Sequence, residues 1–207
     1  MSDLIEGRTP DRQRLPPGQV ITRKWPVLHY DTVPHVDLAT WRFGVGGAVE
    51  QPFALTWEDL QALPRRQTPC DIHCVTRWSR YDNVFEGVSV RLLLQRARVK
   101  PEARYALVHA EQGFTTNLPL DDLDRPENLL ALSHDGGPLT PEHGGPVRLL
   151  VPHLYLWKSA KWVRGIECLE EDVPGFWEQN GYHMRGDPWQ EERYGRPDPA
   201  RMRRGPR

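Results

Sequence analysis

The sulfur, imidazole and guanidinium groups of this chain concentrate in one short segment. Residues 70–80 read CDIHCVTRWSR and contain Cys70, His73, Cys74, Arg77 and Arg80. Three interpretations compete: a buried structural cysteine with satisfied neighbours, a zinc site that uses Cys70, His73 and Cys74, or one thiolate bound to a single metal centre in a cleft. In the third, the arginines would lower the thiol pKa, and a soft thiolate suits a metal of variable valence.

The cysteine count bears on both the zinc site and the compartment. The third and last cysteine is Cys168, and no His-x-x-x-His pair follows, so a zinc site lacks its second half. A small, odd number of cysteines is typical of a reducing compartment. The N-terminus shows no export signal and no apolar run approaches membrane-spanning length. We therefore expect a cytoplasmic protein without a membrane segment.

Two further clusters lie downstream. A Gly-rich stretch, residues 134–146, leads into a short apolar run and carries His143 just before Arg148. The segment KSAKW follows, with Lys158, Ser159 and Lys161. Taken separately, they are a surface loop that enters a strand and a solvated basic patch. Taken together, they could grip an anionic group such as phosphate.

Composition excludes some functions and favours a loop-rich fold. The 207 residues hold 27 Lys and Arg against 28 Asp and Glu, a net charge of -1 that argues against non-specific nucleic-acid binding. Twenty prolines and 17 glycines predict many turns. There is no Gly-rich nucleotide-binding motif and no βαβ alternation, so a dinucleotide-binding fold is not expected.

Local patterns predict a mixed α+β domain. Residues 41–49, 105–109 and 147–151 are typical of strands, and residues 129–132 of a strand or a short turn. Thr56 is a candidate N-cap for a short helix that ends near Pro64, and residues 90–97 space their apolar side chains for a second helix. Residues 111–117, 121–128 and 134–146 are expected to be loops.

The three clusters, in this order and spacing, resemble the molybdopterin-binding domain of the sulfite oxidase family. The matching elements are HCVTRWS, SHDGGPLTPEHGGPVRLLVP and YLWKSAKW, and the resemblance runs from about residue 23 to 170. The single-domain, haem-free members are the most similar, and they include a periplasmic protein-methionine-sulfoxide reductase subunit. The resemblance implies a β-rich α+β domain of the sulfite oxidase type with the cofactor in a cleft.

The resemblance also implies residue roles. Cys74 would be the thiolate ligand of molybdenum, which the plain form of molybdopterin binds through its dithiolene. Arg77 and Arg80 would hold an oxyanion substrate near the metal. Cofactor contacts would come from seven further residues: His143, Arg148, Ser159, Lys161, Lys158, Tyr30 and His109, with His29 beside Tyr30.

The chain departs from the family pattern in several places. Sulfite oxidases carry an arginine five residues after the ligand cysteine, where this chain has Ser79, and the usual Gly before Trp-Lys-Ser is Leu156. Haem and dimerisation domains are not seen, so we expect a separate electron donor or acceptor, no haem, and a plausible monomer.

The expected organisation has three parts: an extended arm at residues 1–20, the molybdopterin domain at residues 21–170, and an aromatic clasp with a basic tail at residues 171–207. The clasp would pack back over the domain. The alternative is a lid that brings Trp177, Tyr182 or His183 near the substrate.

Three functions follow from these patterns. We expect a molybdenum oxidoreductase that transfers oxygen to or from a small sulfur substrate, either sulfite or an S-oxide. A zinc-stabilised binding module and a cofactor-binding fold without catalysis are the alternatives.

Overall fold

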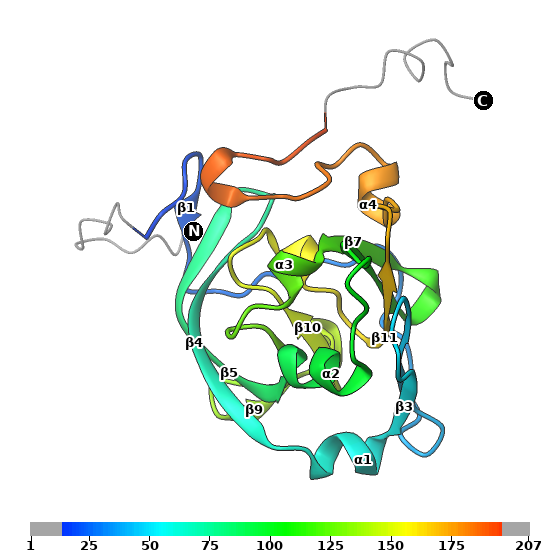
Figure 1. The fold of residues 1–207 in the computed structure, drawn as a ribbon. Coiled ribbons are helices and arrows are strands. Elements are labelled where there is room, and N and C mark those ends of the chain that lie inside the picture. The colour runs from blue at the N-terminus through cyan, green and yellow to red at the C-terminus, as the bar shows by residue number, and fades with distance from the viewer. Residues whose placement is uncertain (1–13, 196–207) are drawn as a thin grey trace.

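The computed structural model describes residues 14–195, which form two β-sheets linked by short helices (Figure 1). One sheet has the order β1 (Val20–Ile21), β5 (Trp78–Ser89), β8 (Leu129–His134), β10 (Arg148–Leu150), with β4 (Arg65–His73) beside β5 and β9 (Gly137–Pro138) beside β8. The other has the order β3 (Phe53–Thr56), β2 (Arg42–Gly47), β11 (Val163–Leu169), β6 (Tyr105–Ala110), β7 (Thr115–Pro119). Strand β1 is parallel to β5, and β2 is parallel to β11. The expected β-rich α+β fold is confirmed.

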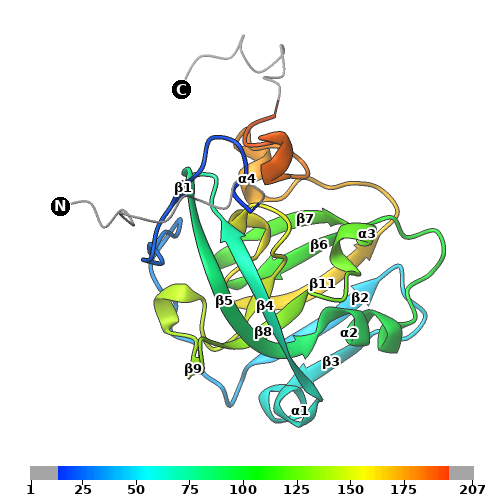
Figure 2. The ribbon, with the colours of Figure 1, turned by 90° about the vertical axis from the view of Figure 1, so that its left-hand side faces the viewer.

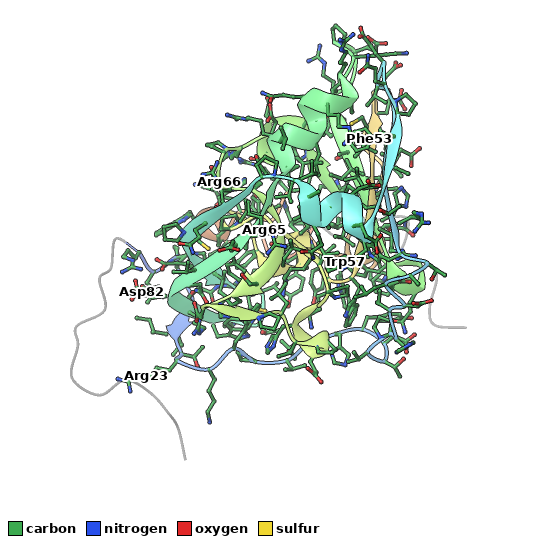
Figure 3. The ribbon with its side chains drawn as sticks, turned by 90° about the horizontal axis from the view of Figure 1, so that it is seen from below. Arg23, Phe53, Trp57, Arg65, Arg66 and Asp82 are labelled. Atoms are coloured by element: carbon green, nitrogen blue, oxygen red, sulfur yellow. The ribbon has the colours of Figure 1, made fainter. Side chains whose placement is uncertain are left out.

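A long hairpin of β4 and β5 dominates one side of the molecule (Figure 2). It runs from α1 (Trp57–Ala62) to the end where β1 and the C-terminal segment lie. Seen from below, Phe53 and Trp57 lie on one side and Asp82 of β5 lies on the other (Figure 3). The turn of this hairpin, residues 74–77, is hydrogen-bonded to Gln19 near one end of the described chain and to Arg193 near the other.

The two predicted helices are short and end where their sequences predict, whereas a further helix at Leu120–Leu123 extends into the expected loop 121–128. Thr56 caps α1 through a capping box with Asp59, whose side chain accepts from the Thr56 amide. Helix α2 (Val90–Ala97) buries one apolar face, including Leu93 and Leu94, against the main core. Two single-turn helices, α3 (Leu120–Leu123) and α4 (Phe176–Gln179), and four 3₁₀ turns (Glu111–Gly113, Pro141–His143, Leu156–Lys158 and Pro188–Gln190) complete the fold.

The main core fills the space between the two sheets. It joins Phe43 and Val108 of one sheet to Val88 and Leu149 of the other. A separate small cluster of Cys74, Val75, Tyr155 and Trp157 lies at the turn of the long hairpin. The segment that carries the sulfur is thus packed apart from the main core.

Several strands differ from the sequence expectation. Strands β4, β5 and β11 were not predicted, and β7 begins inside the expected loop 111–117. Pro69 lies within β4 and polar residues interrupt β5, so neither shows clean alternation; tertiary pairing along their length decides their conformation. Residues 129–132 belong to a strand. Of the expected arm at residues 1–20, Val20 pairs with β5; residues 1–13 and most of the basic tail, 196–207, lie outside the described residues.

No helix within residues 14–195 combines the length and the apolar character of a membrane span.

A close approach of two strands gives a first prediction. Gly87 of β5 lies against β8, and a Cβ at this position would overlap the carbonyl oxygen of Leu130. We expect Gly87→Ala to lower the free energy of unfolding by about 2 kcal/mol or more, because rigid backbone must move. The matched control is Gly46→Ala, since a Cβ on Gly46 meets no heavy atom within 4 Å. Urea denaturation measures both, and equal stability of the two variants would contradict the expectation.

Candidate functional site

A cleft of about 330 Å³ opens beside the turn between β4 and β5. Its walls come from five segments and one strand residue: residues 25, 26 and 28–31, residues 74–76 and 78 of the turn, residues 111, 112 and 114, residues 156, 157 and 159–162, Trp177 with Tyr182, and Arg148. Most of this surface is aromatic or aliphatic. The few polar groups in it are therefore the ones able to orient a ligand.

Cys74 lies at the cleft wall and is 8% exposed. Its amide donates to the Trp78 carbonyl (2.9 Å), and the Arg77 amide donates to the Cys74 carbonyl (3.0 Å). Its Sγ lies 3.1 Å from Oγ1 of Thr76. Burial raises the pKa of the Cys74 thiol, whereas hydrogen bonds from Thr76 and the charge of Arg193 oppose that rise.

Arg77 and Arg80 do not line the cleft, which corrects the expectation that they flank the thiolate and hold substrate. Arg77 has a left-handed backbone (φ 72°) and an exposed side chain. Arg80 contacts Nε2 of His134 (3.0 Å) and donates to a carboxylate oxygen of Asp135 (2.7 Å), two residues at the end of β8. Cations from other segments favour the Cys74 thiolate instead: the charge of Arg193 lowers the pKa of the thiol, and the charge of Cys74 in turn raises the pKa of Arg148 and Lys161.

Two cations do reach the cleft, and both lack a carboxylate partner among the described residues. Arg148 is 2% exposed and donates to the carbonyls of His143 (2.9 Å) and Ser159 (2.8 Å). Lys161 donates to the carbonyls of Leu28 (2.7 Å) and Glu142 (2.6 Å).

The charges of these two side chains are held at a cost. Burial lowers the pKa of Arg148 to about 10. Burial, followed by the charge of Arg148, lowers the pKa of Lys161 to about 7. A buried cation is stable when an anion accompanies it. The cleft therefore fits a ligand that brings negative charge to Arg148 and Lys161.

His143 and Ser159 contact Arg148 through their backbone carbonyls. The His143 ring stacks on Trp25 (4.1 Å between centroids), and its Nε2 lies 3.1 Å from the Trp25 carbonyl oxygen. His143 itself is absent from the cleft lining, whereas Trp25 and Ser159 are part of it. The Ser159 hydroxyl accepts from the amide of Val151 at 2.9 Å. Sequence reasoning missed Trp25, because a lone tryptophan outside a motif gives no signal.

Lys158 and His109 are not brought to the cleft. Lys158 is fully buried and donates to Glu178 (2.6 Å) and to the side chain and carbonyl of Asn117 (both 2.8 Å). His109 lies on β6 and pairs with Glu167 at 3.0 Å. The expected cofactor contacts of both residues are thus replaced by protein contacts.

The C-terminal segment forms one cleft wall. Trp177 and Tyr182 line the cleft and stack on each other at 4.8 Å, while His183 is not in the lining. Tyr30 closes the same side, with its ring 4.2 Å from that of Phe176. The segment therefore supplies side chains to the cleft.

The structure does not support a zinc site in residues 70–74. No group of three potential metal ligands occurs among the described histidines, cysteines and acids. His73 pairs with Ser79 (2.8 Å), and Cys70 packs in a different cluster from Cys74.

Residues 29–177 match the family model for the oxidoreductase molybdopterin binding domain. The chain belongs to this family. It is an oxidoreductase of the sulfite oxidase type, and the cofactor of that type is molybdenum-molybdopterin. The residues of the cleft fit such a group, because they offer one thiol and two cations without carboxylate partners to an anionic pterin.

Relatives agree with this membership. The chain is 55% identical over 182 residues to an uncharacterized oxidoreductase of Bacillus subtilis, covering 87% of this chain and 92% of the relative. It is 28% identical over 155 residues to the catalytic subunit of a protein-methionine-sulfoxide reductase of Campylobacter jejuni, covering 67% and 52%.

Among solved structures, the sulfane dehydrogenase SoxCD of Paracoccus pantotrophus is similar, with a TM-score of 0.64 and 25% identity. That match covers 70% of this chain and 42% of the other. The chain thus spans nearly all of the Bacillus relative but only about half of the reductase subunit and less of SoxCD.

Lys158 gives the second prediction. Lys158→Met leaves the Glu178 carboxylate buried without its cation, so we expect a loss of about 3–5 kcal/mol in the free energy of unfolding. Lys158→Met combined with Glu178→Leu removes both charges and should regain much of that loss. Thermal and urea unfolding of the two variants measure it. If Lys158→Met proved as stable as the original protein, the ion pair between Lys158 and Glu178 would not stabilise the C-terminal segment.

Proposed function

We propose that this protein is a molybdenum oxidoreductase that transfers an oxygen atom to or from a small sulfur compound at the Cys74 cleft. The observation that carries the proposal is the joint placement of the Cys74 thiol and the two cations, Arg148 and Lys161, in one cleft. Thiolate sulfur is a suitable ligand for a redox metal, and buried cations suit an anionic cofactor.

The bound cofactor would supply two-electron oxygen-atom chemistry at molybdenum. Cys74 would provide the one protein ligand. Arg148 and Lys161 would neutralise the cofactor's negative charge, and their contacts with backbone carbonyls hold both heads in place. Trp25 would support Arg148 from one side, since the guanidinium lies 5.3 Å from its ring centre.

Within the two substrate classes, we favour a neutral S-oxide over sulfite. Once Arg148 and Lys161 are assigned to the cofactor, no further lysine or arginine of the described chain lines the cleft. The wall near Cys74 is instead aromatic, formed by Trp157, Trp177 and Tyr182. An anionic substrate would lose its hydration there without a cation in return.

Reduction of an S-oxide to a thioether and water consumes two electrons and two protons. The sulfur–oxygen bond of the S-oxide breaks, the sulfur is reduced to a thioether, and the oxygen leaves as water. The electrons would come from a separate protein donor. We further propose that the protein works in a reducing compartment such as the cytoplasm, because its three cysteines are free.

Cofactor retention tests the role of Arg148. We expect Arg148→Gln to lose most of its molybdenum and pterin, because an anionic cofactor loses its buried partner. Molybdenum by mass spectrometry and released pterin by fluorescence measure occupancy. The control is Arg91→Gln, which alters a surface pair with Asp124 and should keep full occupancy. Full occupancy in the Arg148 variant would exclude the role.

Substrate preference tests the proposed reaction. Protein purified with its cofactor should reduce an organic sulfoxide with a reduced viologen dye at a kcat/KM at least tenfold above that for sulfite oxidation with ferricyanide. Cys74→Ser should abolish the activity, because the metal loses its thiolate. Faster turnover of sulfite would reverse the substrate assignment. Unchanged activity in Cys74→Ser would reject Cys74 as the ligand.

A further inference from the structure

The Cys74 sulfur has a polar neighbour on its own turn. Oγ1 of Thr76 lies 3.1 Å from Sγ, within hydrogen-bond distance for sulfur. A free thiol could donate in this pair, but a metal-bound thiolate has no proton to give. With Cys74 as a ligand, the hydroxyl must therefore be the donor and the sulfur the acceptor.

The turn that carries both residues is fixed from within and from outside. Hydrogen bonds between Cys74, Arg77 and Trp78 close it. The side-chain amide of Gln19 donates to the Cys74 carbonyl at 3.0 Å, and the buried guanidinium of Arg193 donates to the Val75 carbonyl at 2.7 Å.

Gln19 and Arg193 lie 55 and 118 positions from the residues they hold, and both fall outside the range 29–177 that the family model matches. The two ends of the described chain thus converge on this one turn. Thr76 itself is open to the cleft, and the fixed backbone keeps its hydroxyl beside the sulfur.

We propose that Thr76 is a positioning residue that tunes the metal through Cys74, by donating a hydrogen bond to the ligand sulfur. A donor at sulfur withdraws electron density from it, so the thiolate gives less charge to the metal. The reduced metal is then favoured, and the reduction potential is higher than it would be with a bare thiolate. This inference rests on the proposed role of Cys74 as the ligand.

Substitutions of Thr76 and a control substitution at Thr68 isolate the effect of the hydroxyl. Thr76→Val removes the hydroxyl at nearly constant shape, Thr76→Ser keeps it, and Thr76→Ala removes it by a second route if the valine variant does not take up metal. Thr68→Val is the control: Thr68 lies on β4 and its buried hydroxyl has no hydrogen-bond partner among the described residues.

The experiment is a redox titration of the metal-loaded proteins followed by electron paramagnetic resonance. Thr76→Val or Thr76→Ala should shift the ratio of reduced to oxidised metal about tenfold toward the oxidised form at a given potential, which is about 59 mV for one electron. Thr76→Ser and Thr68→Val should stay within twofold of the original protein. A shift below twofold in both hydroxyl-free variants would overturn the proposal.

The same samples separate this inference from the proposed function. A metal signal in the original protein that is altered in Cys74→Ser supports the ligand assignment, whatever Thr76 does. No molybdenum signal in the original protein, or an identical one in Cys74→Ser, would overturn the ligand role of Cys74 and the tuning role of Thr76 with it.

Discussion

Two positive charges in a largely apolar cleft, with backbone carbonyls and tryptophan rings but no carboxylate as partners within residues 14–195, are the constraint around which this site is built. Carbonyl dipoles hold Arg148 and Lys161 in place but do not neutralise them. The remaining cost of burial lowers the pKa of both side chains. An anionic cofactor removes that cost, and the protein therefore gains stability in the region that forms the site when the cofactor binds.

The cleft wall formed by the C-terminal segment depends on a different set of interactions. Glu178 accepts hydrogen bonds from Lys158 and from the indole of Trp157, which anchor the C-terminal segment to residues 157 and 158. Asp122 ties it a second time through Arg185 at 2.7 Å. Burial raises the pKa of Asp122, but hydrogen bonds from His153 and Arg185 outweigh burial and hold that pKa well below its usual range. Both anchors place charge inside the protein rather than in the cleft.

Sequence patterns predicted the parts of the fold that local physics controls. The N-cap at Thr56, the amphipathic face of α2 and the short apolar strands β6 and β10 depend on neighbours within a few residues. The long strands β4 and β5 do not, because their pattern is broken by Pro69 and by polar residues and their conformation comes from pairing with each other. The most extended feature of the fold was therefore the least visible in the sequence.

The sequence by itself determined the family and the β-rich fold class, and its motifs pointed to Cys74, Arg148 and Lys161, which the structure brings to one cleft. Only the tertiary structure decided which nearby charges take part. Arg77, Arg80 and Lys158 belong to the motifs, but none of them lines the cleft. Arg80 binds Asp135 instead, and Lys158 binds the buried carboxylate of Glu178. Trp25 and Arg193 reach the cleft or the turn of Cys74 by packing and hydrogen bonds between segments far apart in the chain, which sequence spacing does not encode. Thr76 is only two residues from Cys74, yet the conformation of the turn decides that its hydroxyl lies beside the sulfur.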